Sequence, residues 1–245
     1  MTAARVFIVA LLVTAGSAAA DTIVSYSLSG SSAGAGVVQP AFTGLVAADD
    51  YDPRTAAIGT DGDSNTISGF SIQNDNVYLR ATGTLQSSLP GGGTNAWHTF
   101  GLSVTGLPAN DVLDLTAVKF NYEATGNNSS TAFYFSVFSD AVGFDDLNDR
   151  LANGNFGGSV VPVTVDLTSA NAVAGNAFTG LTNGADIEFR IYFGDDGSFD
   201  DDTSAIHRVR QFLTIEGETR TIPEPATAAV LALGAIALAT TRRPR

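Results

Sequence analysis

The sequence predicts an all-β protein, an antiparallel β-sandwich of jelly-roll type flanked by one helix at each terminus. Short runs alternate apolar and polar residues, which is typical of half-buried antiparallel strands. Clusters of Gly, Asn, Asp, Ser and Thr separate these runs, and the interior has no long helical pattern. About eight strands at this spacing favour two packed sheets in a single domain over 21–220.

The clearest alternation in the first half of the body is VKFNYEA, where Val118, Phe120 and Tyr122 share one face. Lys119, Asn121 and Glu123 form the opposite face, so this strand is predicted to be half-buried. Weaker runs predict strands over 22–28, 77–82 and 98–104. Residues 29–76 are expected to be flexible and rich in turns.

Four further strands are predicted in the second half of the body. Pro162 within VVPVTVDL indicates an edge strand or a bulge, because proline cannot donate to the ladder. TAFYFSVFS is apolar on both faces and is therefore expected in a central position. DIEFRIYFG alternates Ile187, Phe189, Ile191 and Phe193 with Glu188, Arg190 and Tyr192. VRQFLTIEG alternates similarly, but Gln211 interrupts its apolar face, and a short helical turn is expected over 145–151.

The first twenty residues have the organisation of a secretory signal peptide. Arg5 supplies the positive charge, residues 6–13 supply the apolar core, and Ala18-Ala19-Ala20 supplies the small-residue cleavage site. We expect a signal helix over 1–20 that signal peptidase removes after Ala20.

The last twenty-five residues, 221–245, are predicted to contain a membrane anchor. Residues 226–241 carry no charge and would span roughly 24 Å as a helix, slightly less than a hydrocarbon core of about 30 Å. The arginines at 242, 243 and 245 are expected to stay cytoplasmic, which places the body outside the inner membrane. Pro223 and Pro225 keep the preceding linker extended.

This tripartite end resembles the PEP-CTERM sorting signal of Gram-negative bacteria. The matching parts are Pro223-Glu224-Pro225, the apolar run 226–241 and the arginine-rich end 242–245. The resemblance implies recognition of the motif by an exosortase, cleavage near it, and transfer or release of the body at the cell surface. It also implies a role in exopolysaccharide and biofilm. A permanent single-span anchor is the alternative.

The mature body is strongly acidic. Removing residues 1–20 and 226–245 lowers Lys plus Arg from 12 to 8 against 25 Asp plus Glu, so the net charge becomes about −17. This charge repels nucleic acid and anionic membranes, and it favours cations. We therefore expect no nucleic-acid partner, and only a transient membrane association through the tail.

A weaker resemblance covers 97–216. The segments HTFGLSVTGLPANDVLDLTAVKFNYEA, TAFYFSVFSDAVGF, FTGLTNGADIEFRIYFG and HRVRQFLTIEGE are similar to strands of secreted PEP-CTERM proteins. Those domains look like galactose-binding-type sandwiches without an assigned activity. The resemblance implies a fold and little chemistry.

Two acidic loops are candidate Ca²⁺ sites, since Ca²⁺ takes hard oxygen ligands. One carries Asp195, Asp196 and the aspartates 200–202. The other carries Asp61, Asp63 and Asn65, but it lacks the Gly and Glu of an EF-hand loop. No cofactor is expected, and solvated acidic turns are the simpler interpretation of both loops.

The residues offer little for catalysis. Cysteine is absent, there is no G-x-S-x-G motif, and the two histidines, His98 and His207, are expected at strand edges or on the surface. We therefore predict no catalytic residues and a non-catalytic surface or matrix protein. A polysaccharide-active enzyme or a Ca²⁺-dependent adhesion or glycan-binding module is the alternative. Sugar contact would need aromatic platforms, for which Trp97, Tyr51 and Tyr78 are candidates.

Overall fold

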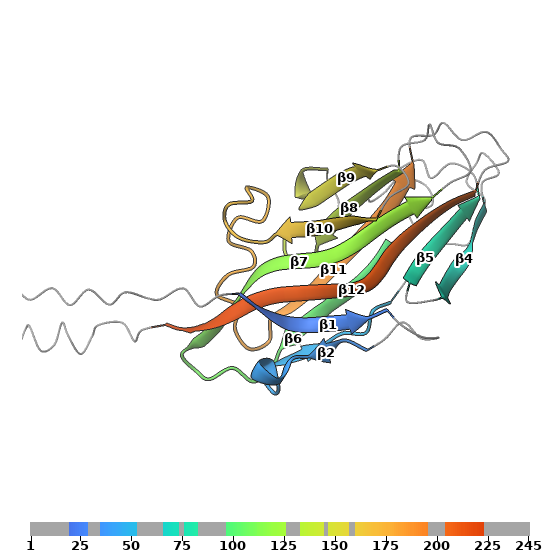
Figure 1. Cartoon of the computed structure of the whole chain (residues 1–245). Helices are drawn as coiled ribbons and strands as arrows, with labels where there is room; N and C mark the ends of the chain where they lie inside the picture. Colours follow the sequence, from blue (N-terminus) through green and yellow to red (C-terminus); the bar gives the residue numbers. More distant parts are fainter. Residues whose placement is uncertain are drawn as a thin grey trace, which may run out of the picture.

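A computed structural model shows two antiparallel sheets packed face to face (Figure 1), so the all-β sandwich predicted from the alternation is confirmed. The structure describes residues 20–28, 35–52, 66–73, 76–82, 97–125, 133–144, 147–156, 160–195 and 204–222. All statements below concern these residues.

The larger sheet is built around two long strands, β7 (Asp111–Thr125) and β12 (Ser204–Thr221). Its strand order is β10-β7-β12-β1-β2, and β5 also pairs with β12 and with β4. The shorter members are β1 (Asp21–Ser27), β2 (Val37–Val38), β4 (Thr66–Gln73), β5 (Asn76–Thr82) and β10 (Val161–Asp166).

The smaller sheet has the order β3-β6-β11-β8-β9. Its strands are β3 (Val46–Ala48), β6 (Trp97–Val104), β8 (Phe133–Ser139), β9 (Ala152–Phe156) and β11 (Asp186–Asp195). Two 3-10 turns complete the described elements, η1 (Pro40–Phe42) and η2 (Leu147–Asp149). The helical turn predicted over 145–151 is present only as η2.

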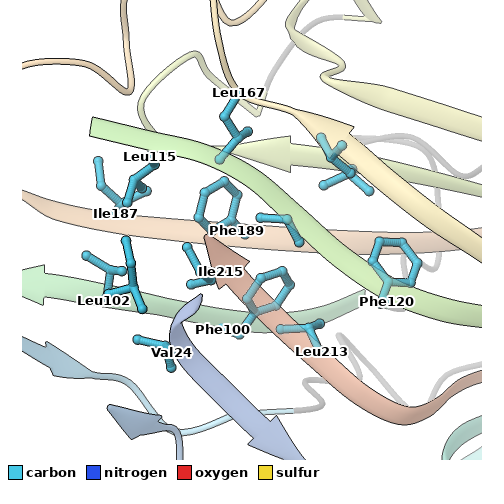
Figure 2. Packing of buried hydrophobic residues seen from close by; sticks show 14 of the residues in the cluster. Val24, Phe100, Leu102, Leu115, Phe120, Leu167, Ile187, Phe189, Leu213 and Ile215 are labelled. Atoms are coloured by element: carbon cyan, nitrogen blue, oxygen red, sulfur yellow. The ribbon is translucent and has the colours of Figure 1, made fainter. Parts of the chain in front are cut away.

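The core lies between the sheets, where the predicted apolar faces meet. Val118, Phe120 and Tyr122 of β7 are buried, and the Phe120 ring lies 5.5 Å from that of Phe135 in β8. Phe189 of β11 is fully buried in the same layer. Figure 2 shows residues of both sheets converging on this layer. Alternation thus predicted which side chains face inward, because successive strand residues point to opposite faces.

The interruption at Gln211 corresponds to a β-bulge. Register shifts between Arg210 and Leu213 in the pairing of β12 with β7, so two residues of β12 have no opposite partner. Val209 and Leu213 lie an even number of positions apart, so they share one face of β12, and both are fully buried. Phe212, within the bulge, is 41% exposed. The bulge also separates the part of β12 that pairs with β5 from the part that pairs with β1.

The two positional predictions for individual strands are confirmed. Pro162 lies in β10, an edge strand of the larger sheet, and β8 lies between β11 and β9. The assignment of Tyr192 to a solvent-facing polar face was wrong, because its side chain is buried. It packs on Phe138 and Trp97, because this part of the outer face is covered by aromatic side chains.

The signal helix over 1–20 and the membrane helix over 226–241 lie outside the described residues, apart from Ala20. Among the residues that the structure does describe, no helix is long and apolar enough to cross a membrane.

Candidate functional site

The outer face of the smaller sheet, the face turned away from the core, carries the densest set of polar and aromatic groups. Alternation along β6 and β11 directs every second side chain outward. These strands pair so that Arg190 lies opposite Thr99, Glu188 opposite Gly101 and Tyr192 opposite Trp97. The six residues therefore form adjacent rows on the outer face. Sequence positions about ninety residues apart are thereby brought together.

A pocket of about 350 Å³ opens on this face. Its lining residues are Asp49, Asp50, Asp52, Thr99, Phe100 and Glu188. The segment after β3 forms one wall because it continues along β6: Asp49 N donates to Gly101 O at 3.1 Å, and Asp52 and Thr99 exchange two backbone hydrogen bonds. Local strand pairing therefore holds three aspartates against the end of β11.

The pocket concentrates negative charge. Partial burial, and then the neighbouring carboxylates of Asp186 and Glu188, raise the pKa of Asp49 above its ordinary value of 3.8. Asp50 and Asp140 add to the effect. Because burial and like charges both disfavour the ionised form, the Asp49 carboxylate is held at a cost to the folded state.

We expect Asp49→Asn to raise the melting temperature at pH 7 slightly, by about 1 °C, since the group is largely solvated. The native pKa is raised, so the native state binds more protons than the unfolded state above about pH 3.8. Stability is therefore lost as pH rises through the native pKa, and the advantage of Asn should vanish below the ordinary value. Thermal melts at pH 3.5 and 7 measure this. Asp50→Asn, at an exposed neighbour, is the matched control, and a benefit of Asp49→Asn that is equal at both pH values would contradict the prediction.

Next to the pocket, Arg190 is held by an acid and two aromatic rings. Its Nε donates to Glu188 Oε1 at 2.6 Å, between two residues that the alternation placed on the same face of the strand. Its guanidinium lies 3.8 Å from the Phe144 ring centroid and 5.5 Å from that of Trp97. Trp97 is half-buried and remains the aromatic group at the rim of this face. Arg190 Nη1 also donates to the Tyr192 hydroxyl at 3.4 Å, and guanidinium stacking on the aromatic faces adds to this arrangement.

His98 is buried, contrary to the expectation of a strand-edge or surface position, and the candidate platform Tyr51 is buried with it. The Tyr51 hydroxyl is hydrogen-bonded to His98 Nδ1, and both side chains are at most 2% exposed. Burial raises the pKa of Tyr51 well above its usual value. His98 points inward because it shares the even-numbered face of β6 with Phe100, and segment 49–52 brings Tyr51 to it. Tyr51 therefore cannot serve as a glycan platform.

The second histidine lies in the other sheet. His207 is in β12 of the larger sheet, whereas His98 is in β6 of the smaller one. Tyr78 is in β5, and neither its side chain nor that of His207 is described. Within the described ranges no group of three or more His, Asp or Glu residues is arranged to hold a metal ion.

Most loop and terminal candidates lie outside the described residues. Of the longer acidic loop only Asp195, the last residue of β11, is described, and Asp61, Asp63 and Asn65 are not. The sorting residues Pro223, Glu224 and Pro225 and the signal residue Ala18 are likewise outside. Ala20 is exposed and directly precedes β1.

Sequence reasoning missed the aspartates of the pocket. They lie in DDYD, within the turn-rich stretch 29–76, and their only signal was local charge density. Nothing in the sequence indicates that this stretch pairs with β6.

Comparison with known proteins adds no function. No protein-family model matches the chain, and no curated protein is similar to it. Among solved structures, one described as "CBM4 structure and function" is 11% identical, covers 69% of this chain and 88% of its own, and has a TM-score of 0.35. A chain from work on gut-microbiota O-glycanases that initiate mucin breakdown is 9% identical over 80% and 98% of the two chains, with a TM-score of 0.33. The secreted serine protease VesC from Vibrio cholerae is 13% identical over 68% of this chain, with a TM-score of 0.30, and the match spans 28% of that protease. Structural similarities this distant support no conclusion about the function of this chain.

Proposed function

We propose that this chain is an exported, exosortase-sorted protein of the cell surface or exopolysaccharide matrix, with a body that acts without catalysis. The observation that carries the proposal is where the folded body starts and stops. β1 begins at Asp21, directly after the expected cleavage site, and β12 ends at Thr221, two residues before Pro223. The two expected processing signals thus flank the sandwich without interrupting a strand.

Both ends of the body also lie at one end of the sandwich (Figure 1). Asp21 pairs with Gly217, four residues before the end of β12. An exported domain that loses its N-terminal signal and is tethered by its C-terminal tail would then stand on the membrane at this end. As part of the proposal we assign the sandwich to the jelly-roll, galactose-binding-like type.

Processing of the C-terminus is the test of sorting. In the native host we expect the mature protein to lack the residues beyond the 223–225 region, because an exosortase would remove them. Mass spectrometry of the protein from wild-type cells should show this loss. Glu224→Ala and an exosortase-deficient strain should both retain Arg245. A tail that ends at Arg245 in every strain would mean a permanent anchor instead.

The outer face of the smaller sheet is the surface we assign to glycan contact. Trp97 provides a half-buried ring, and the adjoining pocket provides carboxylates and the Thr99 hydroxyl, which can bond sugar hydroxyls. The acidic surroundings disfavour anionic polysaccharides, so we propose neutral chains as ligands.

We expect Trp97→Ala to weaken binding to neutral exopolysaccharide roughly two- to tenfold, the range for loss of one stacking contact. Affinity electrophoresis of the secreted body measures this, with Phe212→Ala, an exposed aromatic residue of the other sheet, as the control. If the polysaccharide retarded both variants and the wild type equally, the pocket face would not be the binding surface.

A polysaccharide-active enzyme is the second candidate, favoured by one observation. The pKa of Asp49 is raised by burial and by neighbouring carboxylates, and Asp49 shares a pocket with Glu188. Glycoside hydrolysis uses such a pair of acids in unequal protonation states. Release of new reducing ends from polysaccharide by wild type, and its loss in Asp49→Asn, would favour the enzyme over the binding module.

A further inference from the structure

Three of the connections at one end of the sandwich contain no charged side chain. The three are 39–45, 105–110 and 167–185. They contain seven, six and nineteen residues, and none is Asp, Glu, Lys, Arg or His. We call this surface the uncharged end. In a body with a net charge of about −17 it stands out, and it lies where β12 finishes (Figure 1).

The three connections form one continuous surface. Thr105 N and Gly106 N donate to Leu45 O, which joins the first connection to the second. Leu107 and Asn183 exchange two hydrogen bonds of 2.8 and 2.9 Å between backbone and side-chain amide, which joins the second to the third. Ile222 N donates to Asn110 O at 2.7 Å, so the last described residue of the chain is attached to the same surface.

Four carboxylates that border this surface accept hydrogen bonds within the protein, among them Asp166, which accepts from Thr168 N and Oγ1 at 2.8 and 2.7 Å. Asp114 forms an ion pair with Arg220 and accepts from Gly180 N. Asp111 accepts from the Thr221 hydroxyl at 2.7 Å, and Asp186 accepts from that of Ser103 at 2.9 Å. At the other end of the molecule β11 and β12 are joined by 196–203, which carries four aspartates.

We propose that the uncharged end is the surface by which the body rests on an anionic lipid bilayer while the tail holds it there; this rests on the proposed membrane tether. Only residues 223–225 separate Ile222 from the apolar run that begins at Ala226. Four residue steps extend at most about 14 Å, so the end of β12 cannot lie far from the bilayer.

Charge decides which surface faces the lipid. An anionic bilayer repels carboxylates over a Debye length of about 10 Å at 0.1 M salt. Resting on the uncharged end holds carboxylates at the far ends of the described strands, such as Glu123 of β7, farther away than this. Tyr122, which pairs with Val161, lies eleven residues beyond Asp111 along β7, roughly 37 Å at about 3.4 Å per residue.

Single-cysteine labelling tests the orientation, since the chain has no native cysteine. Ala109→Cys labels the uncharged end and Val160→Cys labels the far end, and both positions are exposed. The membrane-tethered chain, carrying a fluorophore, is reconstituted in vesicles of mixed anionic and zwitterionic lipids with a headgroup-attached quencher. We expect strong quenching at position 109 and none at position 160.

Added charge provides the matched comparison. Ala172→Glu with Thr182→Glu puts two carboxylates on exposed sites of the uncharged end, and Thr164→Glu with Asn153→Glu puts two on exposed sites elsewhere. The first pair should lower the equilibrium constant for resting on the bilayer roughly fivefold per charge at low salt, and 1 M salt should restore it. The second pair should leave quenching at position 109 unchanged.

The outcomes separate the orientation from the tether. Chain that floats with the vesicles but shows equal quenching at both positions, or equal effects of the two charge pairs, overturns the orientation and leaves the tether intact. Chain that fails to float overturns the tether, and the orientation with it.

Discussion

Replacing Phe189 by alanine is expected to lower the free energy of unfolding by about 3–5 kcal/mol, the usual loss for truncating a buried phenylalanine. Phe189 is fully buried in β11, and its ring stacks on Phe100 at 5.4 Å and on Phe178 at 5.7 Å. These contacts join β11 to β6 and to connection 167–185. Neither neighbour can fill the gap, because both rings are themselves packed in the core.

Urea denaturation of the mature body measures this loss as a shift in midpoint. Phe212→Ala is the control, since Phe212 is the same residue type in a strand but 41% exposed. Phe212→Ala should lower the free energy of unfolding by well under half as much as Phe189→Ala. Similar midpoint shifts for the two variants would show that the layer around Phe189 is not the tightly packed centre of the sandwich.

Gly101→Ala is expected to destabilise the protein by about 1–3 kcal/mol, because a side chain has no room at this position. An added methyl group would collide with the Ile187 carbonyl oxygen of the paired strand and lie 2.8 Å from Asp49 Oδ2. The Gly101 carbonyl also accepts a 2.6 Å hydrogen bond from the buried Tyr26 hydroxyl. Strand β6 therefore cannot move aside without breaking a contact in the core.

Ser103→Ala on the same face of β6 is the matched control and should change stability by under about 0.5 kcal/mol, since it loses only an exposed hydrogen bond to Asp186. Thermal melts of both variants measure the difference. The displaced Asp49 should also weaken glycan binding at the pocket in Gly101→Ala. Wild-type stability of Gly101→Ala would mean that β6 and β11 are less closely spaced than the structure shows.

Much of the fold could be predicted locally. Alternation identified the inward residues of β7 and β11, the double-sided burial of β8, and the edge position of the strand containing Pro162. These features follow from one strand and its own pleat. The strands β2, β3 and β9 were missed because runs of two to five residues carry little periodicity. The longer β4 was missed because its register shifts between Ile67 and Phe70, which breaks the alternation.

The candidate site was harder to predict than the fold. Glu188 and Arg190 were correctly placed on one strand face because they lie two positions apart in an alternating run, and the structure joins them in an ion pair. The approach of Asp49, Asp50 and Asp52 to β6 was not predicted. It depends on backbone hydrogen bonds between positions about fifty residues apart in the sequence. The burial of His98 was missed for the same reason, because it contacts Tyr51 from a segment distant in sequence.

By itself, then, the sequence determined an all-β class, the inward faces of the long strands, an acidic body, and the expectation of signals at both termini. Each depends on composition or on the period of one strand. Tertiary structure alone decided the strand order, the burial of the Tyr51–His98 pair, the acidic pocket beside Arg190, and the gathering of three uncharged connections around the end of β12. Those features depend on pairing between distant segments, which backbone hydrogen bonds and shared burial select and local pattern does not encode.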